Sequence, residues 1–268
     1  MNRLRQPLRI LRYAALCGFQ DFGYTWTIWT WAFGLFLRMM TQVAFFASIG
    51  RLLGSDEQVE YLFIGNAVAA AAVGCLTAAT STTWERGAGT LPLLVASPTS
   101  PLLVLMGRST FFIANGLAFS VGALLLLPPL FDVSIPWARL PAVVGIVALT
   151  AVTTYLAATF LGGLVLNATS ARRTVPQVAR MVILAFCGVS VPRTVFPEPV
   201  RRLAGFLPVT HGLDAIRGLL DAAPAAAVFR DIGLEVLVGA GWLVLALLTF
   251  QRLADAGRRD GSIVFSSA

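Results

Sequence analysis

Hydrophobic residues along this chain form long uncharged stretches separated by short clusters of charge. Uncharged runs cover residues 61–84, 109–131 and 140–171. Each run exceeds the roughly 20 apolar residues that a helix needs to cross a bilayer. A further stretch at 22–50 has the same length and apolar character, interrupted by one charge, Arg38. We therefore predict an all-α integral membrane protein, with spans at 22–50, 61–84, 109–131, 140–166 and, extended outward from residue 236, at 232–251.

A sixth span is predicted at 175–192, although Arg180 interrupts it. Orientation supports this span, because arginines gather on the cytoplasmic side of membrane proteins. With six spans and the N-terminus inside, the inner loops hold 12 of the 20 arginines and the outer loops hold 7. Without the sixth span, Arg252, Arg258 and Arg259 would lie outside. The pattern thus predicts a multi-pass protein of the plasma or inner membrane, with both termini cytoplasmic.

Two segments outside these spans have their own character. Residues 1–21 carry apolar residues and arginines on adjoining helical stripes, which predicts an amphipathic helix on the inner membrane surface. A simple positively charged anchor is the alternative interpretation. The run 87–107 is long enough to span, but its prolines, glycines and hydroxyl residues favour a bent interfacial element. We therefore assign a loop to residues 85–101.

Composition agrees with a membrane protein and restricts its chemistry. Hydrophobic residues make up 57% of the 268 residues and charged residues 12%, with a mean hydropathy of +0.79, whereas soluble domains carry about 25% charge. All 20 positive charges are arginine. Because an ATP-binding P-loop requires a lysine, the chain cannot supply one, and we expect it to bind no cofactor itself. Membrane orientation explains the excess of arginine, so nucleic acid is not an expected partner.

Cysteine and histidine do not indicate a metal centre. Cys17, Cys75 and Cys187 lie far apart without metal-ligand spacing, and we interpret them as small packing residues. The single histidine, His211, has no second imidazole with which to form a metal site. We therefore expect neither a metal ion nor a metalloenzyme.

One loop carries a family resemblance. The sequence Trp84-Glu85-Arg86-Gly87-Ala88-Gly89-Thr90-Leu91, followed by Leu93, Leu94, Ser97 and Pro98, resembles the first cytoplasmic loop of ABC-2 type transporter permeases. Chain length, six spans, an N-terminal interfacial helix and a Pro-rich segment before the last span are also similar to that family. The resemblance covers nearly the whole chain.

The resemblance implies the membrane-spanning permease subunit of an ATP-driven exporter for an amphipathic substrate such as a drug, lipid, peptide or glycan. ATP and Mg would be bound by two copies of a separate ATP-binding cassette subunit. A second permease chain, identical or homologous, would complete the pathway within the membrane lipid. By the same resemblance, residues 193–221 would form short re-entrant helices at the outer end of the pathway.

In that family the first cytoplasmic loop forms a coupling helix against the ATP-binding subunit. The resemblance therefore implies a contact at Glu85, Arg86, Gly89, Thr90 and Leu91. These residues also suit such a contact physically, because they combine opposite charges, a sharp glycine turn and an apolar face in one compact element. The alternative is a solvated pair of charges at the membrane edge.

Polar residues within the predicted spans are candidates for the substrate pathway or the dimer interface. Arg38 lies about halfway along its span, where a cation is costly and usually faces a cavity, an interface or a partner group. Gln42 follows one turn later on the same face, and Asn66 lies among small residues that permit close helix packing. Packing at a dimer interface and contact with substrate both remain open for Arg38.

Two other function classes compete with a transporter subunit. A stand-alone secondary transporter coupled to protons or sodium normally keeps carboxylates inside the membrane, yet the spans predicted here place every acid in a loop or at a span end. A membrane enzyme would need a concentrated set of titratable residues, which the sequence does not display. Both alternatives are therefore less favoured, and a third possibility is another kind of polytopic membrane protein.

Overall fold

The computed structural model describes residues 5–81, 101–165 and 174–260. Within these ranges all regular structure is helical, which confirms the predicted all-α class. Five helical segments there are long and apolar enough to cross a membrane: Ile28–Leu52, Asp56–Thr80, Leu102–Leu126, Leu140–Val165 and Ala225–Arg252. The segment predicted as the remaining span forms α11, Thr174–Phe186, with 13 residues. Because such a helix is only about 20 Å long, the count of six spans stays a prediction.

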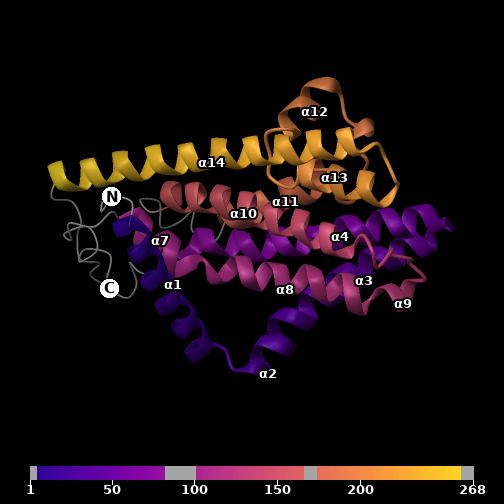
Figure 1. Ribbon diagram of the computed structural model, residues 1–268, viewed down its shortest axis with the longest axis horizontal. Coiled ribbons are helices and arrows are strands. Elements are labelled where there is room, and N and C mark those ends of the chain that lie inside the picture. The colour runs from indigo at the N-terminus through magenta and orange to yellow at the C-terminus, as the bar shows by residue number, and fades with distance from the viewer. Residues whose placement is uncertain (1–4, 82–100, 166–173, 261–268) are drawn as a thin grey trace.

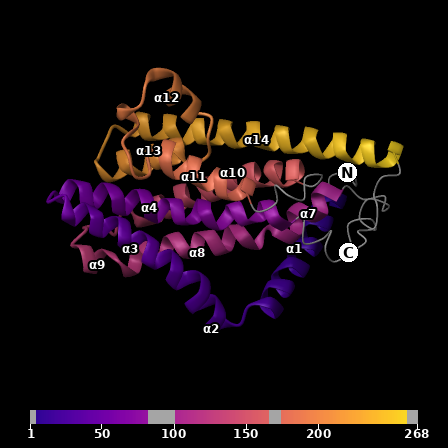
Figure 2. The same ribbon diagram turned by 180° about the vertical axis from the view of Figure 1, so that it is seen from behind.

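The long helices form an elongated bundle. In Figure 1, α4 (Asp56–Leu76), α8 (Phe111–Leu126), α10 (Leu140–Val165) and α14 (Ala225–Asp260) run along the long axis. Helix α4 is central, because it packs against α3 (Leu37–Leu52), α8 and α10. The view from behind in Figure 2 agrees, with α14 along one edge of the bundle. The start of α1 and the end of α14 lie at the same end of the molecule.

Small residues allow α4 and α8 to pack backbone against backbone. A Cβ atom added to Gly74 would lie 2.7 Å from the Cα atom of Gly116, and one added to Gly116 would lie 2.4 Å from the Ala71 carbonyl oxygen. Real Cβ atoms essentially never approach backbone atoms so closely, so neither glycine can be replaced without moving a helix. The core of the bundle therefore depends on the close packing that small residues permit in membrane helices.

The N-terminal region contains a helix that crosses the bundle obliquely. Helix α1, Arg5–Thr25, packs against α7, Pro101–Ser109, and the Arg108 guanidinium binds the Asp21 carboxylate at 2.5 Å. Figures 1 and 2 show α1 and the following segment as a V. The helix runs four residues beyond the predicted 1–21. Its location at the membrane surface stays a prediction.

The first candidate span is built from three successive helical elements. After a break at Trp26, the Thr27 hydroxyl accepts a hydrogen bond from the Thr30 amide at 3.3 Å and caps the short helix α2. The chain continues through a π-helix, η1, and then α3. The bounds of these elements are Ile28–Thr30 for α2, Trp31–Phe36 for η1 and Leu37–Leu52 for α3. This break explains why the span begins later than the predicted residue 22.

Proline residues shift the third span relative to its predicted bounds. The apolar segment begins at Leu102 within α7 and ends with α8 at Leu126, whereas 109–131 was predicted. Pro128 and Pro129 start a separate short helix, α9, Pro128–Phe131, because proline cannot donate the amide hydrogen bond that would continue α8. The rival span at 87–107 falls mostly outside the described residues, and so does most of the predicted loop at 85–101.

Short helices occupy the segment before α14, in the region predicted as 193–221. They are the 3-10 helix η4, Arg193–Val195, and the α-helices α12, Glu198–Ala204, and α13, Thr210–Leu220. Both views place α12 and α13 at the end of the bundle that also holds α9. Helix α14 begins at Ala225, earlier than the predicted residue 232, so its first turns extend alongside α13.

Candidate functional site

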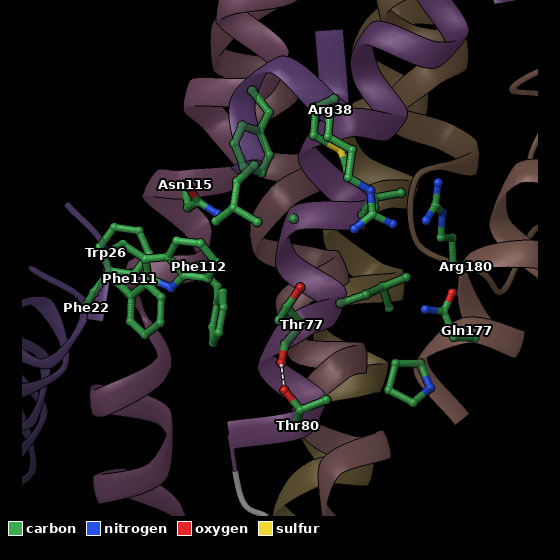
Figure 3. Close-up of a pocket in the computed structure, with 17 residues that line it drawn as sticks. Phe22, Trp26, Arg38, Thr77, Thr80, Phe111, Phe112, Asn115, Gln177 and Arg180 are labelled. Atoms are coloured by element: carbon green, nitrogen blue, oxygen red, sulfur yellow. Dashed lines mark hydrogen bonds between the residues drawn. The ribbon is translucent and has the colours of Figure 1, made fainter. Parts of the chain in front are cut away.

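A pocket of about 420 Å³ lies among α1, η1, α3, α4, η2, α8 and α11, where η2 is the 3-10 helix Thr77–Thr80. Figure 3 shows the side chains that point toward it. The described residues that line it are Phe22, Trp26, Leu35, Arg38, Met39, Val73, Gly74, Leu76, Thr77, Thr80, Phe111, Phe112, Asn115, Phe119, Pro176, Gln177 and Arg180. Its size falls within the range of small-molecule sites.

The π-helix fixes the first span against α8 beside this pocket. The Trp31 indole N–H donates a hydrogen bond to the Asn115 Oδ1 atom at 2.6 Å, and its ring stacks on Phe119 with centroids 6.1 Å apart. Two residues after η1 ends, the chain reaches Arg38 near the start of α3. Single π-helical turns within α-helices occur frequently at functional sites. Here the π-helix and its tryptophan anchor determine where Arg38 meets the pocket.

Two arginines give one side of the pocket a positive charge. Arg180 on α11 donates a hydrogen bond from its Nη2 atom to the Gln42 Oε1 atom at 2.5 Å. Arg38 lies close enough for its charge to act on Arg180. Figure 3 shows both guanidinium groups in the same part of the pocket. Among the described residues that line the pocket there is no carboxylate to balance these charges.

Aromatic rings form the opposite side of the pocket. Phe111 packs against Phe22 and Phe112, with ring centroids 4.9 and 4.0 Å apart. Figure 3 places these three rings together with Trp26, away from Arg38 and Arg180. The pocket is thus amphipathic, with a cationic side and an aromatic side.

Only some of the site residues predicted from sequence lie at the pocket. Arg38 lines the pocket, and Gln42 supports it through Arg180. Asn66 is fully buried on α4, where its Nδ2 atom donates a hydrogen bond to the Leu62 carbonyl of the same helix at 2.9 Å, and its Oδ1 atom has no hydrogen-bond partner in the described part of the chain. The five coupling residues, Glu85, Arg86, Gly89, Thr90 and Leu91, lie outside the described residues.

Sequence reasoning missed the role of Arg180, which was treated only as an interruption of a short span. Its position relative to Arg38 follows from the packing of α11 beside α4, and no local pattern in the sequence indicates that packing. A cation within an apolar segment was nevertheless a usable signal, since such residues usually face cavities or partners.

The position of Glu235 corrects the prediction that every acid lies in a loop or at a span end. It lies inside the candidate span Ala225–Arg252 on α14 and is fully buried. Its Oε1 atom accepts hydrogen bonds from the Val209 amide at 3.1 Å and from the Thr153 hydroxyl, and its Oε2 atom accepts one from the Gly212 amide at 3.0 Å. The error arose because α14 begins earlier than predicted.

The carboxyl group of Glu235 thus caps the start of α13. The first backbone N–H groups of a helix lack partners within the helix, and an acidic side chain satisfies them. The preceding residue, Val209, has φ of 85°, a left-handed conformation that is strained for a β-branched side chain. A side chain at position 212 would clash with the Thr150 hydroxyl. Glycine at position 212 and the Glu235 cap therefore hold this turn in place.

Contacts made by arginine side chains fix the position of the rest of α13. The Arg139 guanidinium donates hydrogen bonds to the carbonyls of Leu219 and Leu220 at 2.9 and 2.8 Å, near the end of the helix. Arg217 stacks on the Tyr61 ring of α4, 3.6 Å from its centroid. In the middle of the helix, Asp214 forms an ion pair with Arg193.

Asp214 and His211 on α13 each interact with neighbouring groups, but together they do not form a catalytic set. Burial raises the pKa of Asp214 above its ordinary value, while the charge of Arg193 opposes this rise. The ring of His211 bonds the Gly205 carbonyl at 3.0 Å, so it serves the turn before α13. Among the described residues, no group of three or more His, Cys, Asp or Glu side chains could hold a metal ion.

The five membrane-length helices found in the described ranges, packed around a core rich in small residues, define a multi-pass helical membrane protein. A sequence model of the family described as "ABC-2 family transporter protein" matches residues 53–248, well over half of the chain. The chain therefore belongs to the ABC-2 transporter family, as the loop at Trp84–Leu91 indicated. No curated protein matches the chain.

Proposed function

We propose that this chain is the permease subunit of an ATP-driven exporter in the plasma or inner membrane, with both termini cytoplasmic. Membership of the ABC-2 transporter family over residues 53–248 carries the proposal. The absence of lysine supports a division of labour, because the chain cannot form a lysine-containing P-loop. A separate ATP-binding subunit, in two copies, would supply ATP hydrolysis, and a second permease chain would complete the pathway.

The proposal predicts that the purified chain alone hydrolyses no ATP above background. Hydrolysis is expected only when a lysine-containing P-loop protein is present in the same preparation. The measurement is phosphate release from the chain alone and from the co-purified complex in lipid nanodiscs. Robust hydrolysis by a preparation shown by mass spectrometry to contain no other protein would contradict the proposed role.

The segment around Glu85 and Leu91 is proposed as the contact with the ATP-binding subunit. Its support is the Glu-Arg-x-x-Gly-Thr-Leu pattern at residues 85–91. Replacing Glu85 with alanine removes a charge, and a charge-assisted hydrogen bond contributes about 1.5–3 kcal/mol, which corresponds to a tenfold to hundredfold loss of partner affinity. Leu91→Asp should weaken the contact by placing a charge on the apolar face.

These variants should insert into the membrane normally, since neither residue lies in a predicted span. The measurement is retention of the ATPase on the tagged permease, together with transport. The matched control is Glu57→Ala, which removes an exposed acid from the opposite end of α4. Full ATPase retention and full export by both the Glu85 and Leu91 variants would exclude this loop as the coupling element. The 87–107 run would then have to be reconsidered as a span.

A further inference from the structure

We infer that the pocket beside Arg38 and Arg180 binds an amphipathic anion, with the anionic group at the two guanidinium groups and the apolar part against the aromatic rings. This inference rests on the proposed function for the statement that the bound molecule is a substrate. The binding itself requires only this chain. The chemical class is a phosphate or similar oxyanion attached to a hydrocarbon portion.

The charges around the pocket favour an anion. Two guanidinium groups face the same space, and the described lining residues include no carboxylate. Neighbouring like charges repel each other most strongly where water is scarce, so a bound anion would relieve this repulsion. A cation at membrane depth is expensive without a partner group or water. An oxyanion supplies both the opposite charge and several hydrogen-bond acceptors.

Hydrogen bonding at Arg180 also favours a bound anion. Its Nη2 atom is held by Gln42, while its Nε atom is buried and has no hydrogen-bond partner in the described part of the chain. Gln42 is neutral, so it orients the guanidinium without neutralising it. We therefore assign Gln42 as a positioning residue, and Arg38 and Arg180 as the residues that contact the anion.

The other side of the pocket selects for an apolar group attached to the anion. Phe22, Phe111 and Phe112 present a continuous aromatic surface from α1 and α8. A free inorganic anion would leave this surface uncovered, whereas the hydrocarbon part of an amphiphile would pack against it. The arrangement therefore favours an amphiphile over a small ion such as free phosphate.

The test is binding to the full-length chain in a neutral detergent, measured by native mass spectrometry as ligand is titrated. Three probes separate the contributions: lysophosphatidic acid, lysophosphatidylcholine with the same acyl chain, and inorganic phosphate. Lysophosphatidic acid should bind at least tenfold more tightly than the zwitterionic lipid. Inorganic phosphate at a hundredfold excess should not displace it. Equal affinity for the two lipids, or displacement by inorganic phosphate, would overturn the inference.

Variants of Arg38 and Arg180 test whether the ligand binds at these two arginines. Arg38→Gln and Arg180→Gln should each weaken binding of lysophosphatidic acid by tenfold or more and leave lysophosphatidylcholine binding unchanged. Arg38→Lys keeps the charge and should retain most of the affinity. Arg51→Gln is the matched control on the same helix α3, since Arg51 lies outside the pocket and binds Asp132 at 3.0 Å. Wild-type affinity in both glutamine variants would overturn the inference.

A second variant keeps the test decisive if an arginine variant does not fold. Phe22→Ala leaves both guanidinium groups in place and should reduce the gain in affinity that a longer acyl chain brings. An unchanged dependence on chain length would contradict the assignment of the aromatic side. All these assays use the permease without its ATPase, so a failure to recover a P-loop partner would affect only the proposed function.

Discussion

Replacing Glu235 with alanine should destabilise the protein by about 2–6 kcal/mol and release the start of α13. The substitution leaves the buried amides of Val209 and Gly212 without acceptors, and each unsatisfied donor costs about 1–3 kcal/mol. Thr153 adds less to the loss, because its single hydroxyl hydrogen can be donated instead to the Thr150 carbonyl, which lies 3.0 Å away. The measurements are thermal unfolding in detergent and hydrogen exchange at the amides of residues 209 and 212.

Two comparisons make the Glu235 result specific. Glu235→Gln preserves the side-chain shape and one acceptor oxygen, so its stability should lie between those of the wild type and the alanine variant. Glu57→Ala removes an exposed acid from the first turn of α4 and should change stability by less than about 1 kcal/mol. If Glu235→Ala unfolds at the wild-type temperature with unchanged protection of residue 212, the cap does not hold α13.

The same variants separate a structural carboxyl group from a proton-coupling one. A proton-coupled secondary transporter would use a carboxyl group inside the membrane, and Glu235 is the described acid most deeply buried. Its bonds to Val209, Gly212 and Thr153 account for its burial without a transport role. Export by the Glu235→Gln protein should therefore still depend on ATP hydrolysis. If the wild type instead exports in response to an imposed proton gradient, and this variant does not, the result would favour the secondary transporter.

Replacing Gly74 with valine should prevent normal packing of the bundle. The first added carbon would lie 2.7 Å from the Gly116 Cα atom, and the nearest neighbours are backbone atoms that cannot move aside. Overpacking of this kind typically costs 1–3 kcal/mol even where side chains can adjust, and we expect a loss at or above the upper end of that range. The measurements are the yield of monodisperse protein and its thermal unfolding temperature.

Gly145 provides a matched control for this substitution. It lies within α10, and an added Cβ atom at that position meets no atom within 4 Å. Gly145→Val should therefore fold with a stability close to wild type. Similar losses in the two variants would mean that the effect arises from helix propensity and not from the contact between α4 and α8.

The sequence was sufficient for the helical membrane class and for most of the long helices. Their uncharged runs are long, and the requirement to satisfy backbone hydrogen bonds in lipid leaves a helix as the natural solution. The family was recognisable from the loop at residues 84–98. By contrast, the boundaries near Trp26 and Pro128 depend on local caps and on proline, which a hydrophobicity pattern does not resolve.

The pocket and the Glu235 cap could not be predicted in the same way. Arg38 and Arg180 are far apart in the chain, and their common pocket results from packing of η1, α3 and α11 around α4. Glu235 was placed at the end of the predicted span 232–251, because the stretch before it contains charges and α14 was expected to start later. A carboxyl group that caps another helix stabilises it through tertiary contacts, so no local pattern around residue 235 could show its partners.

The contact between α1 and α7 joins the start of α7 to the aromatic side of the pocket. Helix α7 begins at Pro101, and Asp21 on α1 is tied to Arg108 on α7. Phe22, the next residue of α1, forms part of the aromatic side of the pocket. If the ATP-binding subunit contacts the chain as proposed, we expect a displacement of Pro101 to move α7 and α1 together, because the two helices pack against each other. Such a displacement would shift Phe22 relative to Arg38 and so change the shape of the pocket.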